Sequence, residues 1–305
     1  MKEPIIFAGC SFTWGQGLWS YCPTNLKVPT ESEYVQEHHP IPDVAQDFRE
    51  ENRYANIVGR HYNLEPIIKR YNGGTDEESI RFIDEIKENI VRDDTLLTKN
   101  VVWNDVKLCV FQTTQLYRSS FYFNYKGNDY RVFSTPDKKN LDRVEKIKYL
   151  FNRDGSPTRY PLILNENEST DVFIDWLIDN NYSVEDFEKI QCSYMTNNIK
   201  NKLKELEEKY NIPTLILCWT GEYLMDFVFD SWLSKRLIKI NYFGTNFNTI
   251  EEMFFANKEL EIRNDPRVIH ESGNDGHPSL NCHKHIASSI INTIEKNNLI
   301  KKHIL

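Results

Sequence analysis

The chain has 305 residues, of which 40% are hydrophobic and 27% charged, and its formal net charge is -8. This composition is typical of a globular protein that buries one substantial core, so we expect a single enlarged domain over residues 1–305. The acidic balance excludes a basic, phosphate-coating surface, and nucleic acid is therefore not an expected partner.

Cysteine usage and hydropathy indicate the compartment. The six cysteines are scattered, and several lie in apolar strand-like runs where cysteine behaves as a small hydrophobe. We therefore expect a reducing, cytoplasmic setting, which for a viral protein would be the host cytoplasm or the virion. No signal peptide and no membrane partner are expected, because the sequence shows neither a basic, apolar leader nor an apolar stretch of membrane-spanning length.

Short apolar runs alternate with amphipathic helical patterns along the chain, which predicts an α/β fold: a three-layer α/β/α sandwich with a mainly parallel sheet. The expected strands are, in chain order, 5–8, 66–69, 106–111, 214–219 and 237–240. Helices are expected over 54–62, over 77–90 and through 286–294. Two stretches, at about 20–48 and 119–183, fit neither sheet strands nor crossover helices and are expected to be insertions, placed to form a lid or a specificity wall.

The start of the second insertion is rich in aromatic residues, namely Tyr117, Phe121, Tyr122, Phe123, Tyr125 and Tyr130. Flat rings with polar tips suit the faces of a carbohydrate, but the same residues can form a small core of the insertion itself. We favour the core.

The first segment with chemical potential follows the first strand and reads Gly9-Cys10-Ser11-Phe12-Thr13. Glycine permits a close turn, so Ser11 is expected at the carboxyl edge of the sheet. Position alone favours a structural turn serine over a nucleophile.

The second such segment, Asp275-Gly276-His277-Pro278-Ser279, stands just before the last amphipathic helix. Pro278 favours an extended His277, and residues two apart in extended chain point to the same side, so Asp275 and His277 can face one pocket. A serine nucleophile needs a neutral imidazole that is itself oriented by a carboxylate. Ser11, His277 and Asp275 can supply these three roles.

With these two segments the chain resembles the SGNH/GDSL hydrolases, in the phage and bacterial variant that opens on Gly-Cys-Ser-Phe-Thr. The resemblance implies a flavodoxin-like sheet, a Ser11–His277–Asp275 triad and ester hydrolysis through an acyl-serine. It also implies a glycine block, matched by Asn72-Gly73-Gly74-Thr75. Gly73 or, as we prefer, Gly74 would then offer a backbone N–H to the developing oxyanion beside that of Ser11, although such glycines can simply shape a turn.

The chain departs from the family pattern in three places. Cys10 replaces the acidic residue of the first block, which is expected to alter turn packing. The family's oxyanion asparagine is missing after the third strand, where Thr114 or Gln112 could donate instead; Thr114 matches the position best. Asn274 stands three residues before the histidine, where many relatives have Asp, but we retain Asp275 because a carboxylate stabilises imidazolium better than an amide.

Three functions remain open: a hydrolase that deacylates a carbohydrate or another small ester, an acyltransferase that uses the same triad, and a noncatalytic structural or binding module. The missing asparagine supports the last. No cofactor and no metal are expected, because the His38-His39 pair and His277, His283 and His285 lack a spacing that defines a ligand geometry. His283 and His285 are expected on the polar part of the last helix. No oligomeric state is predicted.

Overall fold

In the computed structural model the described residues are 2–10, 13, 15, 18–22, 43–68, 75–88, 101–116, 120–133, 169–182, 184–268 and 276–300. The chain divides into two compact units: Met1–Thr114 with Asn201–Leu305, called the sheet unit, and Gln115–Lys200, called the insertion unit. The second expected insertion, 119–183, falls inside the insertion unit, whereas 23–42 of the first lies outside the described residues. That both units belong to one enlarged domain stays a prediction.

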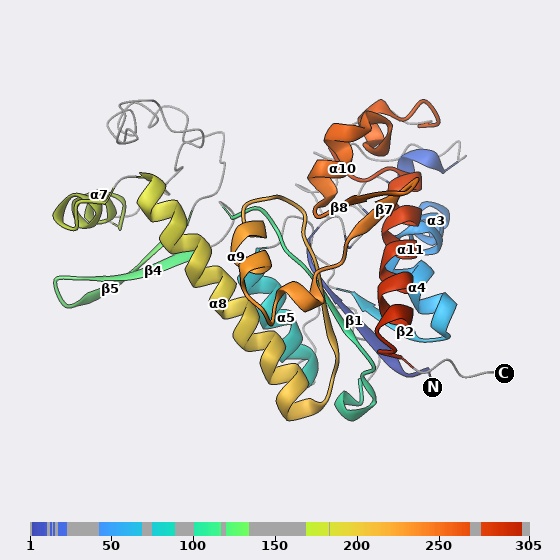
Figure 1. Cartoon of the computed structure of the whole chain (residues 1–305), viewed down its shortest axis with the longest axis horizontal. Coiled ribbons are helices and arrows are strands. Elements are labelled where there is room, and N and C mark those ends of the chain that lie inside the picture. Colours follow the sequence, from blue (N-terminus) through green and yellow to red (C-terminus); the bar gives the residue numbers. More distant parts are fainter. Residues whose placement is uncertain are drawn as a thin grey trace. The chain divides into compact units, whose positions relative to one another are not determined.

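The described part of the sheet unit is built on a parallel sheet. Its strands are β1 (Pro4–Ala8), β2 (Glu65–Ile68), β3 (Cys109–Gln112) and β6 (Thr214–Leu217), paired in the order β2-β1-β3-β6 (Figure 1). Every residue of β1, β3 and β6 is buried, which is typical of parallel strands covered on both faces. The α/β class and the parallel sheet are thus confirmed.

Helices cover the two faces of this sheet, giving the expected three layers. On one face α4 (Tyr54–Tyr62) and α11 (Leu280–Lys296) pack Val58 and Ile290 against Ile5 and Phe7 of β1. Figure 1 places α5 (Asp76–Lys87) on the other side of the sheet, together with the part of α8 (Val184–Tyr210) that belongs to the sheet unit. Each large apolar side chain buried in this way contributes roughly 1.5–3 kcal/mol.

The sheet unit also contains α3 (Asp43–Asn52), α9 (Leu224–Phe229), α10 (Ile250–Ala256) and a hairpin of β7 (Ile240–Tyr242) and β8 (Thr245–Phe247). The expected fifth strand at 237–240 is wrong. Leu237 makes one parallel bridge with Ile216, and the chain then enters the antiparallel hairpin, whose turn has positive φ at Phe243 and Gly244. Within the described ranges, no helix has the length and apolarity needed to cross a bilayer.

The insertion unit contains a hairpin of β4 (Ser120–Tyr125) and β5 (Asn128–Phe133), then α7 (Ser169–Asp179) and the first part of α8. Lys126 and Gly127 form the hairpin turn with positive φ. Phe123 of β4 packs with Phe173 of α7, ring centroids 5.5 Å apart, and Tyr125 packs against the same cluster. These contacts confirm the small-core interpretation for Phe123 and Tyr125.

We expect Gly9→Ala to destabilise the protein, because the turn after β1 leaves no room for a side chain. A Cβ at Gly9 would collide with the Thr13 hydroxyl and lie 2.9 Å from Cβ of Gln112. The free energy of unfolding, measured by urea denaturation, should fall by about 1–3 kcal/mol. Gly221→Ala is the control, since a Cβ there meets nothing within 4 Å; equal losses in the two variants would contradict the steric argument.

Candidate active site

Two of the predicted site residues, Thr114 and His277, lie among the described residues, whereas Ser11, Gly74 and Asp275 lie outside them. Convergence of the triad therefore stays a prediction. The structure describes the frame around it: the residues on both sides of Ser11, the start of α5 after the glycine block, the end of β3 and the start of α11.

Gln112, the last residue of β3, joins the end of this strand to the turn after β1. Its Oε1 accepts from the Thr13 hydroxyl at 2.6 Å, and its Nε2 donates to Sγ of Cys10 at 3.1 Å and to the carbonyl of Thr113 at 3.2 Å. Because Thr13 donates to Gln112, the Tyr54 hydroxyl, 2.6 Å away, is the donor to Thr13. All of these side chains are buried.

These contacts bear on the choice of oxyanion donor between Gln112 and Thr114. An amide nitrogen has two hydrogens, and the Gln112 nitrogen donates to two acceptors, Sγ of Cys10 and the carbonyl of Thr113. Gln112 is thereby committed to holding the turn after β1. Thr114 is the candidate that remains, and it is fully buried.

Asp76 begins α5 and contacts Thr114 across the edge of the sheet. Its Oδ1 accepts from the Thr114 N–H at 2.8 Å and its Oδ2 from the Tyr223 hydroxyl at 2.7 Å. The carboxyl is fully buried, and this burial raises its pKa to about 7, although the bonds from Tyr223 and Thr114 favour the charged form. Asp76 is not among the residues predicted from the sequence; the signal available for it is the Thr75–Glu78 capping box, which is present and marks the start of the helix.

The histidine segment is held by an antiparallel pairing. The carbonyl of His277 accepts from the N–H of Ile262 at 2.9 Å, and the N–H of Ser279 donates to the carbonyl of Leu260 at 2.7 Å. Ser279 then caps α11, accepting from the N–H of Cys282 at 3.3 Å. His277 is half-buried and directly precedes this fixed segment.

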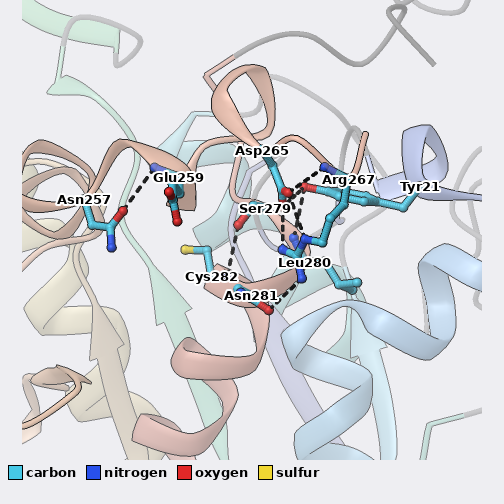
Figure 2. Close-up of polar contacts among 9 residues, drawn as sticks. All are labelled: Tyr21, Asn257, Glu259, Asp265, Arg267, Ser279, Leu280, Asn281 and Cys282. Carbon is cyan, nitrogen blue, oxygen red and sulfur yellow. Dashed lines mark hydrogen bonds and ion pairs between the residues drawn. The ribbon is translucent and has the colours of Figure 1, made fainter. Parts of the chain in front are cut away.

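An ion pair between the buried Asp265 and the exposed Arg267 supports the start of α11 (Figure 2). Asp265 accepts from Arg267 Nε at 2.8 Å and from the Tyr21 hydroxyl at 2.8 Å, and Arg267 reaches on to Oδ1 of Asn281. Burial alone would raise the pKa of Asp265, but the bonds from Arg267 and Tyr21 outweigh it and hold the pKa below its usual value. The N–H of Leu280 donates to the Tyr21 hydroxyl, so the cluster anchors the first turn of the helix.

His283 corrects one prediction from the sequence, because it is fully buried and does not lie on the polar part of the last helix. It stands three residues before Ile286 and seven before Ile290, which puts it on the inward face of α11. Its Nδ1 accepts from the N–H of Tyr54 at 3.3 Å, and the two rings stack. Burial, with His277 and Arg53 adding, lowers the pKa of His283 to about 3, so the ring is neutral and lies near enough to His277 to sense its charge.

The low pKa of His283 makes stability depend on pH in a defined direction. Below about pH 6.5 the unfolded chain binds a proton at this residue and the native chain does not, so stability is lost as the pH falls. We expect the wild type to lose about 1–2 kcal/mol more than His283→Gln between about pH 6.5 and 4.5, measured by urea denaturation. His61→Gln, at an exposed position, is the control; a parallel pH dependence in wild type and His283→Gln would refute the assignment.

No protein-family model, curated protein or solved structure matches the chain. Its function is therefore inferred from the residues themselves. Within the described part of the chain, no three His, Cys, Asp or Glu side chains are grouped as a metal site would require.

Proposed function

We propose that the chain is a serine ester hydrolase of the SGNH/GDSL type. Ser11 is the nucleophile, His277 the general base and Asp275 the acid that orients His277, while Thr114 and the N–H groups of Ser11 and Gly74 stabilise the oxyanion. The substrate is an acylated carbohydrate or another small ester, and the reaction needs no cofactor.

One observation carries the proposal: the predicted site segments are linked by a continuous set of contacts within the sheet unit. Cys10 and Thr13, on the two sides of Ser11, both bond to Gln112. Thr114, two residues after Gln112, bonds to Asp76 at the helix that follows the glycine block. These contacts lie at the carboxyl ends of parallel strands, where ligands bind in α/β proteins.

The histidine segment is linked to the same set. His283 senses the charge of His277 and accepts from the backbone of Tyr54, whose hydroxyl bonds to Thr13. Interactions thus link the four segments that carry or adjoin the expected site residues: the turn after β1, the start of α5, the end of β3 and the start of α11.

In the proposed reaction His277 takes the proton of the Ser11 hydroxyl as its oxygen attacks the ester carbonyl. The tetrahedral intermediate carries a negative oxygen that the oxyanion donors stabilise. His277 then gives the proton to the leaving alkoxide, which leaves an acyl-serine. Water, deprotonated by His277, releases the acid and restores the serine.

A reducing setting, as in a cytoplasm, is part of the proposal. All six cysteines are among the described residues, and each is buried outside any disulfide. Secreted chains more often pair their cysteines.

Ser11→Ala should abolish hydrolysis of a short-chain aryl ester and leave the thermal unfolding midpoint nearly unchanged, because a small hydroxyl contributes little packing. A fluorophosphonate should label Ser11 in the wild type, as located by peptide mass spectrometry. His277→Ala should slow this labelling strongly, because the hydroxyl loses its proton acceptor. Full activity of Ser11→Ala, or rapid labelling of His277→Ala, would contradict the triad.

Thr114→Val keeps the shape of the side chain and deletes its hydroxyl. If that hydroxyl stabilises the oxyanion, kcat should fall roughly tenfold or more while KM changes less, because the bond strengthens in the transition state. Thr196→Val, in the insertion unit, is a control for loss of a buried threonine hydroxyl. Unchanged kinetics of Thr114→Val would leave the oxyanion to backbone donors.

A noncatalytic module of the same fold is the second candidate, and the engagement of Gln112 favours it. With no asparagine after β3 and with the Gln112 amide used internally, Thr114 is the one of the two candidate side-chain donors that is left among the described residues. Wild-type protein without turnover on a broad ester panel would make this candidate the better one. An acyltransferase would instead show transfer to added alcohols in competition with water.

A further inference from the structure

Asp76 is a buried titratable group that the proposed reaction does not use. In the strand order, β1 lies between β2 and β3. Asp76 follows β2 along the chain, Thr114 follows β3 and Tyr223 follows β6. The contact of Asp76 with Thr114 therefore joins the segments that leave the two strands flanking β1, and β1 is the strand that leads into the Gly9–Cys10 turn.

The bridge made by Asp76 is compatible with either protonation state. When the carboxyl is ionised, both oxygens accept, from the Thr114 N–H and the Tyr223 hydroxyl. When it is neutral, Oδ1 still accepts from Thr114, while Oδ2–H can donate to the Tyr223 oxygen over the same 2.7 Å. Protonation changes the charge beside Thr114 and keeps the two contacts.

Among the residues that the structure describes, the groups that interact with this carboxyl do not neutralise it. The titratable ones are Glu77 on α5, Tyr223 after β6 and Cys218, which directly follows β6, and none of them is a Lys or an Arg. With these neighbours an ionised Asp76 places a negative charge next to Thr114. Such a charge opposes the negative charge that develops on the ester oxygen in the transition state.

We propose that Asp76 is a positioning residue that works in its neutral form, holding Thr114 at the oxyanion position without adding a negative charge there. The inference rests on the function proposed above. It adds a condition to that function, because the site loses activity when Asp76 ionises.

The condition predicts the shape of the pH profile. On the alkaline side Asp76, whose pKa burial raises to about 7, ionises and should lower kcat by roughly tenfold. Asp76→Asn offers the same pair of contacts as the neutral acid, an oxygen to Thr114 and an N–H to Tyr223, and cannot ionise.

The experiment measures kcat for an aryl ester, corrected for spontaneous hydrolysis, and the rate of fluorophosphonate labelling at Ser11, from about pH 6 to about pH 9. The wild type should lose activity as the pH rises above neutrality, and Asp76→Asn should keep activity near neutral pH and lose the alkaline fall. Asp76→Ala, which lacks both contacts, should lower kcat at every pH by more than it changes KM. Asp105→Asn, at an exposed carboxyl near the amino end of β3, is the matched control and should keep the wild-type profile.

Thermal unfolding midpoints at each pH show whether a variant is folded where its rate is measured. A wild type that reacts at Ser11, together with an Asp76→Asn variant that keeps the alkaline fall, would overturn this inference and leave the proposed function standing. An Asp76→Ala variant that is folded by its midpoint and has the wild-type kcat would do the same. A wild type that neither hydrolyses esters nor reacts at Ser11 would overturn the proposed function and this inference with it.

Discussion

The described edge of the sheet depends on the need to satisfy one buried amide, that of Gln112. A buried polar group left without a partner costs about 1–3 kcal/mol, and Gln112 meets this requirement with Thr13, Cys10 and its own neighbour Thr113. The turn after β1 is thereby tied to β3, and the close approach of the two explains why a glycine stands at position 9. Through Tyr54 the same network reaches α4 and then His283 of α11, so both termini of the chain contribute to one polar layer.

Burial acts in opposite directions on two titratable side chains near this edge of the sheet, His283 and Asp76. Burial removes both groups from water and thereby favours their neutral forms. It therefore lowers the pKa of His283 and raises the pKa of Asp76. Near neutral pH His283 is therefore neutral, whereas Asp76 is close to the midpoint of its titration. A neutral histidine adds no fixed charge to compete with the charge that develops in a transition state.

Local patterns predict most of the sheet unit, and long-range contacts account for what they miss. The runs ending in Ala8, Ile68, Gln112 and Leu217 are short, apolar and bounded by polar residues, so the parallel strands follow from run length and flanking residues. His283 is polar and is therefore expected on the polar side of α11, but its spacing from Ile286 and Ile290 puts it on the buried face. Asp76 cannot be recognised as buried from the sequence, because its partner Tyr223 lies 147 residues away and an acidic residue at a helix start is ordinarily explained by the helix dipole.

The chemical identity of residue 76 decides whether the bridge at this edge can titrate. An asparagine would accept from Thr114 and donate to Tyr223 without any cost of burying a charge, so a structural bridge alone does not require an acid. An aspartate, whose interacting neighbours within the described part of the chain include no Lys or Arg, keeps the bridge and adds a titration near neutrality. Groups of this kind cluster where a protein uses its charge state. Because the bridge is proposed to work in its neutral form, an asparagine would serve it equally well, and what the aspartate adds is a dependence of the rate on pH, which only a site with turnover can show.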